Sequence, residues 1–526
     1  MKKIECSLWK LVEYFAAILF GYIFILVFLL GDRIDYKMKK TFLIPNYITL
    51  LLMVIGYVIY LKKKPKVNLY NKDKSGRYLN EIDIDHWVKV LGIVFFFGQI
   101  YVFYNIFFET GWDSGSYILP AARQLAGYSE TNVLQSVYFS NYPNNLFLIN
   151  IFAFVLKLNK KIGVFMNENQ AMSIVVLNCL ICNVTLQLIY RVVKRLSTRK
   201  NALIAFMFSC VLLGMSPWNV ICYSDQIAIL FPILIYYIYL HEEWNEYIRG
   251  IGCIFLGYIG YCIKPQAAMI LIAIIIYELL HKIVEIDKTQ ITKTVGVLLV
   301  SCILIGATSI GMKQLYKGEG FQLDKNQKIG MTHFLMMGMN AEYQGLYCEN
   351  DVETSRSART YQERSKLNIN ITQERLSEMK FQGLAKLIAD KTLITYNDGT
   401  FAWSCEGGFY QFLKANKNDS VSGRLKELYY EDGKFYPLFI TTMQIMWLIC
   451  IFFVWIGIGN KLRKGGKSEK SYVVLLMALL GLTIFEMLFE ARARYLYANV
   501  PLYIVLMFCG NGRKDMMIGK NAGKER

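Results

Sequence analysis

The 526-residue chain is 55% hydrophobic and 15% aromatic, and its formal net charge is +18. Soluble proteins contain about 45–50% apolar residues, so this content exceeds what one soluble core would hold. The Lys and Arg residues form short clusters between apolar runs rather than one basic face, which argues against nucleic-acid binding and instead indicates membrane topology.

Apolar runs long enough to cross a bilayer recur along the chain, because a helix of about 20 residues spans the hydrocarbon core. We therefore predict an all-α polytopic membrane protein with about 12 transmembrane helices. The first run follows a Lys-containing start and is too long for a signal-peptide core, so we expect it to remain as an anchor. In chain order, the predicted spans are 8–30, 42–61, 86–108, 171–192, 201–217, 225–240, 248–263, 266–281, 293–311, 436–458, 471–489 and 494–509.

The basic clusters predict the orientation, since Lys and Arg are enriched in short cytoplasmic loops. The strongest cluster, at 62–77, is placed inside the cell. The alternation of sides from that cluster onward requires that the apolar stretch 144–158 does not cross the membrane. Its length of about 15 residues is short for a typical span, so we predict that it forms a helix on the outer surface. Alternation then puts further clusters inside at 191–200, 461–470 and 513–526, while Lys37, Lys39 and Lys40 come out external.

The predicted spans divide the chain into four regions. Within the outer region, apolar residues at helical spacing over 372–390 predict a helix. Most cysteines lie in apolar runs and behave as small hydrophobes, whereas Cys348 and Cys405 form a candidate disulfide pair in the outer region. The regions are two N-terminal spans with a basic cytoplasmic loop (1–85), a transmembrane core with a first external loop at 109–170 (86–312), a small, mainly helical extracytoplasmic domain (313–435), and the C-terminal spans with a basic cytoplasmic tail (436–526).

Polar residues gather on the predicted outer surface. Taken singly, each has a structural explanation, such as helix capping, a favourable helix-dipole contact or snorkelling to the interface. Ionisable residues at membrane depth are nevertheless costly and usually mark a function. The set comprises Glu109, Trp112 and Asp113 in the first external loop, Tyr142, Asn144 and Asn145 at the surface helix, Asp225 and Lys264 at span ends, and Glu490, Arg492, Arg494 and Tyr495 before the last span.

Two carboxylates beside two or three cations suit the transfer of a group from a lipid phosphate. Arg and Lys would hold the phosphate, Arg through paired hydrogen bonds and Lys as a point charge. A carboxylate would remove the proton from an acceptor hydroxyl. Fixed cations would stabilise the charge that develops on the phosphate. This chemistry requires no cofactor, and Asp225 is the one candidate ligand for a divalent metal.

Five short elements occur in an order that resembles the C-type glycosyltransferase superfamily, in particular bacterial relatives of protein O-mannosyltransferases and aminoarabinose transferases. The resemblance runs from about Trp87 to the last span. It implies an inverting glycosyltransferase that uses a polyprenyl-phosphate sugar on the extracytoplasmic face of the bacterial plasma membrane. The elements are Gly111-Trp-Asp-Ser-Gly115, Tyr142-Pro-Asn-Asn145, Tyr223-Ser-Asp225, Lys264-Pro265 and Arg492-Ala-Arg494-Tyr495.

The resemblance also implies roles for individual residues. Asp113 becomes the general base or the carboxylate that positions the acceptor, and Asp225 assists it or holds a metal. Lys264, Arg492 and Arg494 correspond to cations near the lipid phosphate. His333 lies in a similar segment, where a structural role is an equal alternative. Substrate binding is assigned to Glu109, Trp112, Tyr142, Asn144, Asn145, His333, Glu490 and Tyr495.

The sequence departs from these relatives in two motifs and at its N-terminus. Trp112-Asp113-Ser114 replaces the Asp-Glu pair of the mannosyltransferases, which argues against a protein acceptor. Tyr142-Pro143-Asn144-Asn145 replaces the Lys-Pro-Pro of the aminoarabinose transferases and so removes a cation, which argues against lipid A. The two N-terminal spans have no counterpart in the core pattern.

Two other classes of function stay open. A polysaccharide polymerase or ligase acting on diphosphate-linked glycans also uses external Arg residues, but it has less need of two acidic loops. A lipid or glycan transporter or flippase would place repeats and polar residues near the bilayer midplane, whereas these charges lie at the outer edge. The expected partners are the lipid-linked donor and membrane lipids, with no nucleic acid. The sequence does not determine the sugar, the acceptor or the oligomeric state.

Overall fold

The computed structural model describes residues 2–31, 42–62, 82–129, 132–165, 170–285, 288–403, 420–466 and 468–509, and these residues contain helices but no strand. Lys37, Lys39, Lys40, the basic loop beyond residue 62 and the basic tail lie outside this part of the chain. Cys405 lies outside it as well, so its pairing with Cys348 stays a prediction. The α-helices are α1 (Lys2–Leu30), α2 (Asn46–Lys62), α3 (Ile82–Ile106), α4 (Leu119–Leu125), α5 (Val137–Asn141), α6 (Asn145–Ile162), α7 (Met172–Leu196), α8 (Arg199–Ser209), α9 (Ser224–Ala228), α10 (Leu230–Leu240), α11 (Glu246–Ile263), α12 (Met269–Glu285), α13 (Lys288–Gly318), α14 (Met331–Gly338), α15 (Glu349–Ser357), α16 (Tyr361–Tyr396), α17 (Val421–Tyr429), α18 (Tyr436–Lys464), α19 (Lys470–Leu488), α20 (Arg494–Tyr497) and α21 (Val500–Cys509). Short π- or 3-10 helical turns are η2 (Ser114–Ile118), η4 (Cys210–Gly214), η5 (Pro217–Val220), η6 (Pro265–Ala268) and η7 (Lys325–Gln327).

Each predicted span coincides with a helix or with consecutive helices. Among the described residues, seven helices are long and apolar enough to cross a membrane, which confirms a helical integral membrane protein. The predicted spans 201–217 and 248–263 form α8 with η4 and α11, which are not in that set, so the count of about 12 crossings stays a prediction. The seven are Glu5–Leu30, Ile84–Ile106, Met172–Leu196, Pro265–Lys282, Thr292–Gly318, Tyr436–Lys464 and Lys470–Leu488, and shorter apolar helices cover Asn46–Ile59, Ser224–Leu240 and Val500–Cys509.

The helices differ sharply in how much apolar surface they bury. In α21, residues 500–508 are all buried, and the helix packs against α18, α7 and α19. A helix that is apolar on all sides belongs in such a central position. Peripheral α13 instead exposes Leu299 by 62% and Ile303 by 61%. Exposed apolar side chains on a spanning helix face lipid, because a helix satisfies its own backbone hydrogen bonds in the bilayer.

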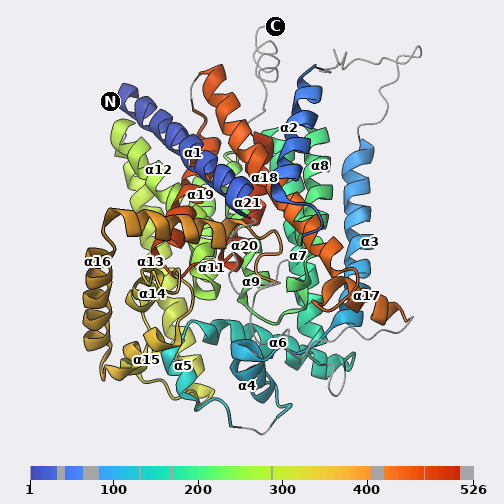
Figure 1. Cartoon of the computed structure of the whole chain (residues 1–526). Helices are drawn as coiled ribbons and strands as arrows, with labels where there is room; N and C mark the ends of the chain where they lie inside the picture. The colour runs from blue at the N-terminus through green and yellow to red at the C-terminus, as the bar shows by residue number, and fades with distance from the viewer. Residues whose placement is uncertain are drawn as a thin grey trace.

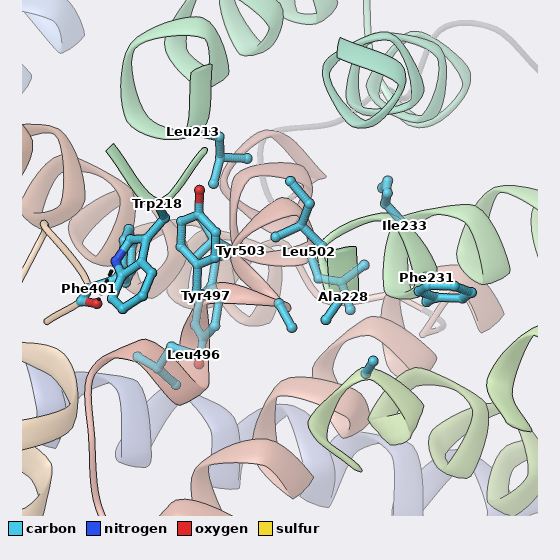
Figure 2. Packing of buried hydrophobic residues seen from close by; sticks show 14 of the residues in the cluster. Leu213, Trp218, Ala228, Phe231, Ile233, Phe401, Leu496, Tyr497, Leu502 and Tyr503 are labelled. Carbon is cyan, nitrogen blue, oxygen red and sulfur yellow. Dashed lines mark hydrogen bonds between the residues drawn. The ribbon is translucent and has the colours of Figure 1, made fainter. Parts of the chain in front are cut away.

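The end of the region predicted as an outer domain lies inside the helix bundle. Residues 391–403 are all buried, and the Asn397 side-chain amide donates to the Gly31 carbonyl at the end of α1 over 2.8 Å. Figure 2 shows Trp218 of η5 beside Phe401, where the indole N–H donates to the Phe401 carbonyl over 2.9 Å, with Tyr497 of α20 packed close by. These contacts join the segment after α16 to helices from both halves of the chain.

A layer of shorter helices covers one end of the bundle. Figure 1 shows α4, α5, α6 and α15 at that end, opposite the end where α1 begins. Helix α6, which contains the predicted surface helix 144–158, runs across the bundle rather than along it (Figure 1). It ends at Gly163, whose φ of 77° suits glycine. Helix α16 bends at Lys380, which has a φ of 51°. In Figure 1, α9 and α20 lie between the long helices and this layer.

Candidate functional site

Asp225 and Lys264 form a buried ion pair. Asp225 lies in the first turn of α9, and Lys264 lies between α11 and η6. The Lys264 Nζ donates to Asp225 Oδ1, and the two side chains are 7% and 1% exposed for Lys264 and Asp225 respectively. In the described part of the chain, Asp225 Oδ2 has no hydrogen-bond partner. Buried charges of this kind are tolerated only when they are paired. The pair therefore joins two predicted site residues that are far apart in sequence.

The Arg494 guanidinium lies against the rings of three aromatic residues. Its carbon is 5.1 Å from the ring centroid of Trp112, 5.6 Å from that of Tyr223 and 5.5 Å from that of Tyr495. The Tyr495 ring also faces the Lys264 ammonium, at 5.1 Å. Contacts between cations and aromatic rings within about 6 Å are attractive, and more so where water is excluded. They bring the loop that contains Trp112, the start of α9 and α20 to one place.

The Gly111–Gly115 motif is explained by a tight loop. A Cβ at Gly115 would lie 1.6 Å from the Thr110 carbonyl oxygen, so a larger residue would displace the backbone. Trp112 adopts a φ of 34°, which is uncommon for a non-glycine residue. Strained backbone of this kind is found preferentially at functional sites. The loop directs Trp112 toward Tyr223, and the centroids of their rings are 4.7 Å apart.

Asp113 lies within electrostatic range of Arg494, in a largely buried position. The Tyr138 hydroxyl donates to its carboxylate, and the Asn145 side-chain amide donates to the Tyr138 hydroxyl over 2.6 Å. Burial raises the pKa of Asp113, while the Tyr138 hydrogen bond and the Arg494 charge oppose that rise. A carboxylate with a raised pKa is better matched to accepting a proton near neutral pH.

Glu490 organises the segment between α19 and α20. Its carboxylate accepts a hydrogen bond from Arg492 Nε over 2.9 Å and another from the Tyr495 hydroxyl over 3.1 Å. The Glu490 charge also acts on Asp113. Arg492 is therefore neutralised within its own segment, whereas Arg494 faces the cluster of aromatic rings and Asp113.

Three of the predicted site residues form their hydrogen bonds with residues other than Asp113, Arg494 and Lys264. Both carboxylate oxygens of Glu109 bind Arg123 in the same external loop, one of them over 2.9 Å. Asn144 is exposed and donates to Asn145 Oδ1 over 3.2 Å. His333 is buried with its Nδ1 2.7 Å from Ser355 Oγ, and burial lowers its pKa to about 4. His333 is thus neutral at pH 7, and its contacts favour the structural alternative.

Tyr142 lies at the edge of the cluster, where sequence reasoning missed a neighbouring cation. Burial raises the pKa of Tyr142 to about 12, and the exposed Arg356 of α15 forms a hydrogen bond with it. Asp113 and Glu490 also act electrostatically on the Tyr142 hydroxyl. Arg356 lies in a polar helix with no motif around it, so the sequence carried no signal for its position.

Two further ionisable residues were also missed, although both interrupt apolar sequence. Glu486 is a single acidic residue near the end of the apolar helix α19, and it is fully buried. Lys391 lies in the apolar end of α16 and is fully buried too. Buried ionisable residues in apolar segments are a signal of function that is visible in sequence. Glu486 is electrostatically coupled to Lys264 and Lys391.

The donors present do not fit a divalent metal. Within the described ranges, no group of three or more His, Cys, Asp or Glu residues could hold one. Oxygen-ligated cations need several converging oxygens. The Lys264 ammonium instead occupies Asp225 Oδ1, and the Tyr138 hydroxyl engages the Asp113 carboxylate. No metal role is assigned to Asp225.

The long apolar helices define a polytopic integral membrane protein. A family model described as "Conserved hypothetical integral membrane protein" matches residues 5–510, and the chain belongs to this family. No curated protein and no solved structure matches the chain.

Proposed function

We propose that the protein is an inverting glycosyltransferase of the bacterial plasma membrane. It would move a sugar from a polyprenyl-phosphate donor to an extracytoplasmic acceptor, such as a cell-envelope polymer, a glycolipid or a protein. The observation that carries the proposal is a largely buried carboxylate, Asp113, within electrostatic range of a guanidinium, Arg494, that lies against aromatic rings.

Each group has a role in the transfer step. The planar N–H donors of the Arg494 guanidinium are the groups suited to hold the donor phosphate. The acceptor hydroxyl attacks the anomeric carbon from the face opposite the phosphate, and its proton passes to Asp113. The new carbon–oxygen bond forms as the bond to the phosphate oxygen breaks. Polyprenyl phosphate leaves with that electron pair, and the anomeric configuration is inverted.

The buried Asp225–Lys264 ion pair is proposed to stabilise the charge that develops on the phosphate. Lys264 and Arg494 contact the same Tyr495 ring, so the Lys264 charge lies close to the proposed phosphate position. Asp225 holds the ammonium in place. A cation fixed before the reaction stabilises developing negative charge without a cost of reorganisation. In this proposal Asp225 acts by positioning Lys264 rather than as a second base.

The local charge balance favours a monophosphate donor over the diphosphate donor of a polymerase or ligase. Lys264 is neutralised by Asp225, and Arg492 by Glu490. The net positive charge available to a ligand is therefore small. A glycosyl phosphodiester carries one negative charge, whereas a diphosphate carries two, and each additional buried charge needs its own partner.

Binding of polyprenyl phosphate, the leaving group of the proposed transfer, tests the assigned role of Arg494 directly. Purified protein in nanodiscs is titrated with a polyprenyl phosphate, and Arg494→Ala is compared with wild type. We expect Arg494→Ala to weaken binding by roughly 10- to 100-fold, since a hydrogen bond to a charged group contributes about 1.5–3 kcal/mol. Arg123→Ala is the matched control, because the Arg123 guanidinium is paired with the Glu109 carboxylate. Unchanged affinity in Arg494→Ala, or an equal loss in the control, would contradict the assignment.

A further inference from the structure

Lys391 joins three segments that are far apart in sequence. It is fully buried in the second half of α16. Its Nζ donates to the Phe489 carbonyl over 2.6 Å and to the Gly338 carbonyl over 2.9 Å. Phe489 follows α19 and begins the segment 489–495, which carries Glu490, Arg492 and Arg494. Lys391 is thus bonded to the backbone from which the proposed phosphate-binding residue projects.

Two glycines, Gly338 and Gly345, allow the segments around Lys391 to pack at short distances. A Cβ at Gly338 would lie 2.5 Å from the Leu488 carbonyl oxygen, so α14 contacts the end of α19 directly. Gly345 has a φ of 73°, and a Cβ there would lie 2.9 Å from the Lys391 Cδ. The Gly345 carbonyl in turn accepts a hydrogen bond from the Ala491 backbone N–H over 2.9 Å. Segment 489–495 is therefore held from two sides.

The buried Lys391 side chain interacts electrostatically with two acidic residues. Glu486 of α19 and Glu490 of segment 489–495 act electrostatically on Lys391, and Glu486 also acts on Lys264. Burial lowers the pKa of Lys391 to about 7, and the two carboxylates oppose that lowering. Burial of a lysine is unfavourable unless paired charges and hydrogen bonds compensate. The unfavourable free energy of burying Lys391 indicates that the residue has a function at this position.

We propose that Lys391 is a positioning residue that fixes segment 489–495 in the geometry needed by Arg494. Helix α20 has four residues and is too short to hold this geometry alone. Hydrogen bonds from an ammonium group are stronger than neutral ones, which makes Lys391 an effective anchor for two carbonyls. The effect on donor binding rests on the proposed function, whereas the order of the segment does not.

Hydrogen exchange tests the positioning without reference to any activity. In the full-length protein in nanodiscs, Lys391→Met is expected to speed amide exchange across 489–496 by tenfold or more. Lys386→Met is the matched control, because Lys386 is exposed on the same helix, and exchange there should stay within twofold of wild type. Unchanged exchange in Lys391→Met, or an equal change in the control, would overturn the proposal. If Lys391→Met does not fold, the polar variant Lys391→Gln provides the second test, with an expected increase of about threefold, and unchanged exchange in it would count against the proposal.

Donor binding then separates positioning from general loosening. With polyprenyl phosphate as the probe, Lys391→Met should raise Kd about tenfold in the wild-type background but less than twofold in an Arg494→Ala background. Equal effects in both backgrounds would show that Lys391 does not act through Arg494. If wild-type protein does not bind polyprenyl phosphate, the proposed glycosyltransferase function fails, and the exchange measurement still decides whether Lys391 orders the segment.

Discussion

Replacing Lys264 by Met leaves a carboxylate buried without its counter-ion. The Asp225 side chain is 1% exposed, and within the described residues its Oδ2 has no other hydrogen-bond partner, so solvent cannot substitute for the ammonium. Removing one partner of a buried pair costs about 3–5 kcal/mol, whereas an exposed pair contributes about 0–1 kcal/mol. We therefore expect Lys264→Met to reduce the folding equilibrium constant roughly 10²- to 10⁴-fold.

A double-mutant cycle measures this cost. Wild type, Lys264→Met, Asp225→Asn and the double variant are unfolded in detergent micelles with increasing SDS. The double variant should lose less stability than the sum of the single variants, because no charge remains uncompensated. Lys194→Met is the matched control, since Lys194 and Asp85 are 36% and 33% exposed, and we expect it to lose no more than about 1 kcal/mol. A loss below about 1 kcal/mol in Lys264→Met, or an additive cycle, would refute the reasoning.

Two further predictions concern the reaction and the orientation of the chain. Asp113→Asn should reduce sugar transfer by about 100-fold or more, the usual contribution of a general base. Burial raises the pKa of Asp113, so the wild-type rate should fall as the pH is lowered through that raised value and the carboxylate takes up a proton; a flat acid limb of the pH–rate profile would contradict this role. Reporter fusions after Phe108 should be extracytoplasmic, and those after Lys200 and Lys464 cytoplasmic. A cytoplasmic reporter after Phe108 would remove the outer-face site.

Several site predictions could be made from local pattern because they depend on residue type and spacing. Asp113 was selected from the short motif Gly111–Gly115, and in the structure Gly115 of that motif lies in a loop too tight for a Cβ. For Asp225 and Lys264, the sequence predicted only that both residues lie on the same side of the membrane. Their direct contact depends on how α9 packs against α11, which no local pattern encodes.

Other contacts could not be read from neighbouring sequence. Glu109 and Asp113 are four residues apart in one loop, yet Glu109 binds Arg123 while Asp113 faces Tyr138. The direction of each side chain is set by the local backbone, including the positive φ of Trp112. Sequence reasoning grouped the two acids because they are close in the chain. Closeness in the chain, however, says little about the orientation of side chains in a strained loop.

By itself, the sequence determined that this is a helical integral membrane protein, because long apolar runs exclude a soluble fold and a helix satisfies its backbone polar groups within the bilayer. It also concentrated attention on polar residues at the ends of those runs. Only the tertiary structure decided which of them meet. The contacts of Lys391 with Gly338 and Phe489 join residues 53 and 98 positions apart, and such pairings arise from the packing of whole helices rather than from the local chain.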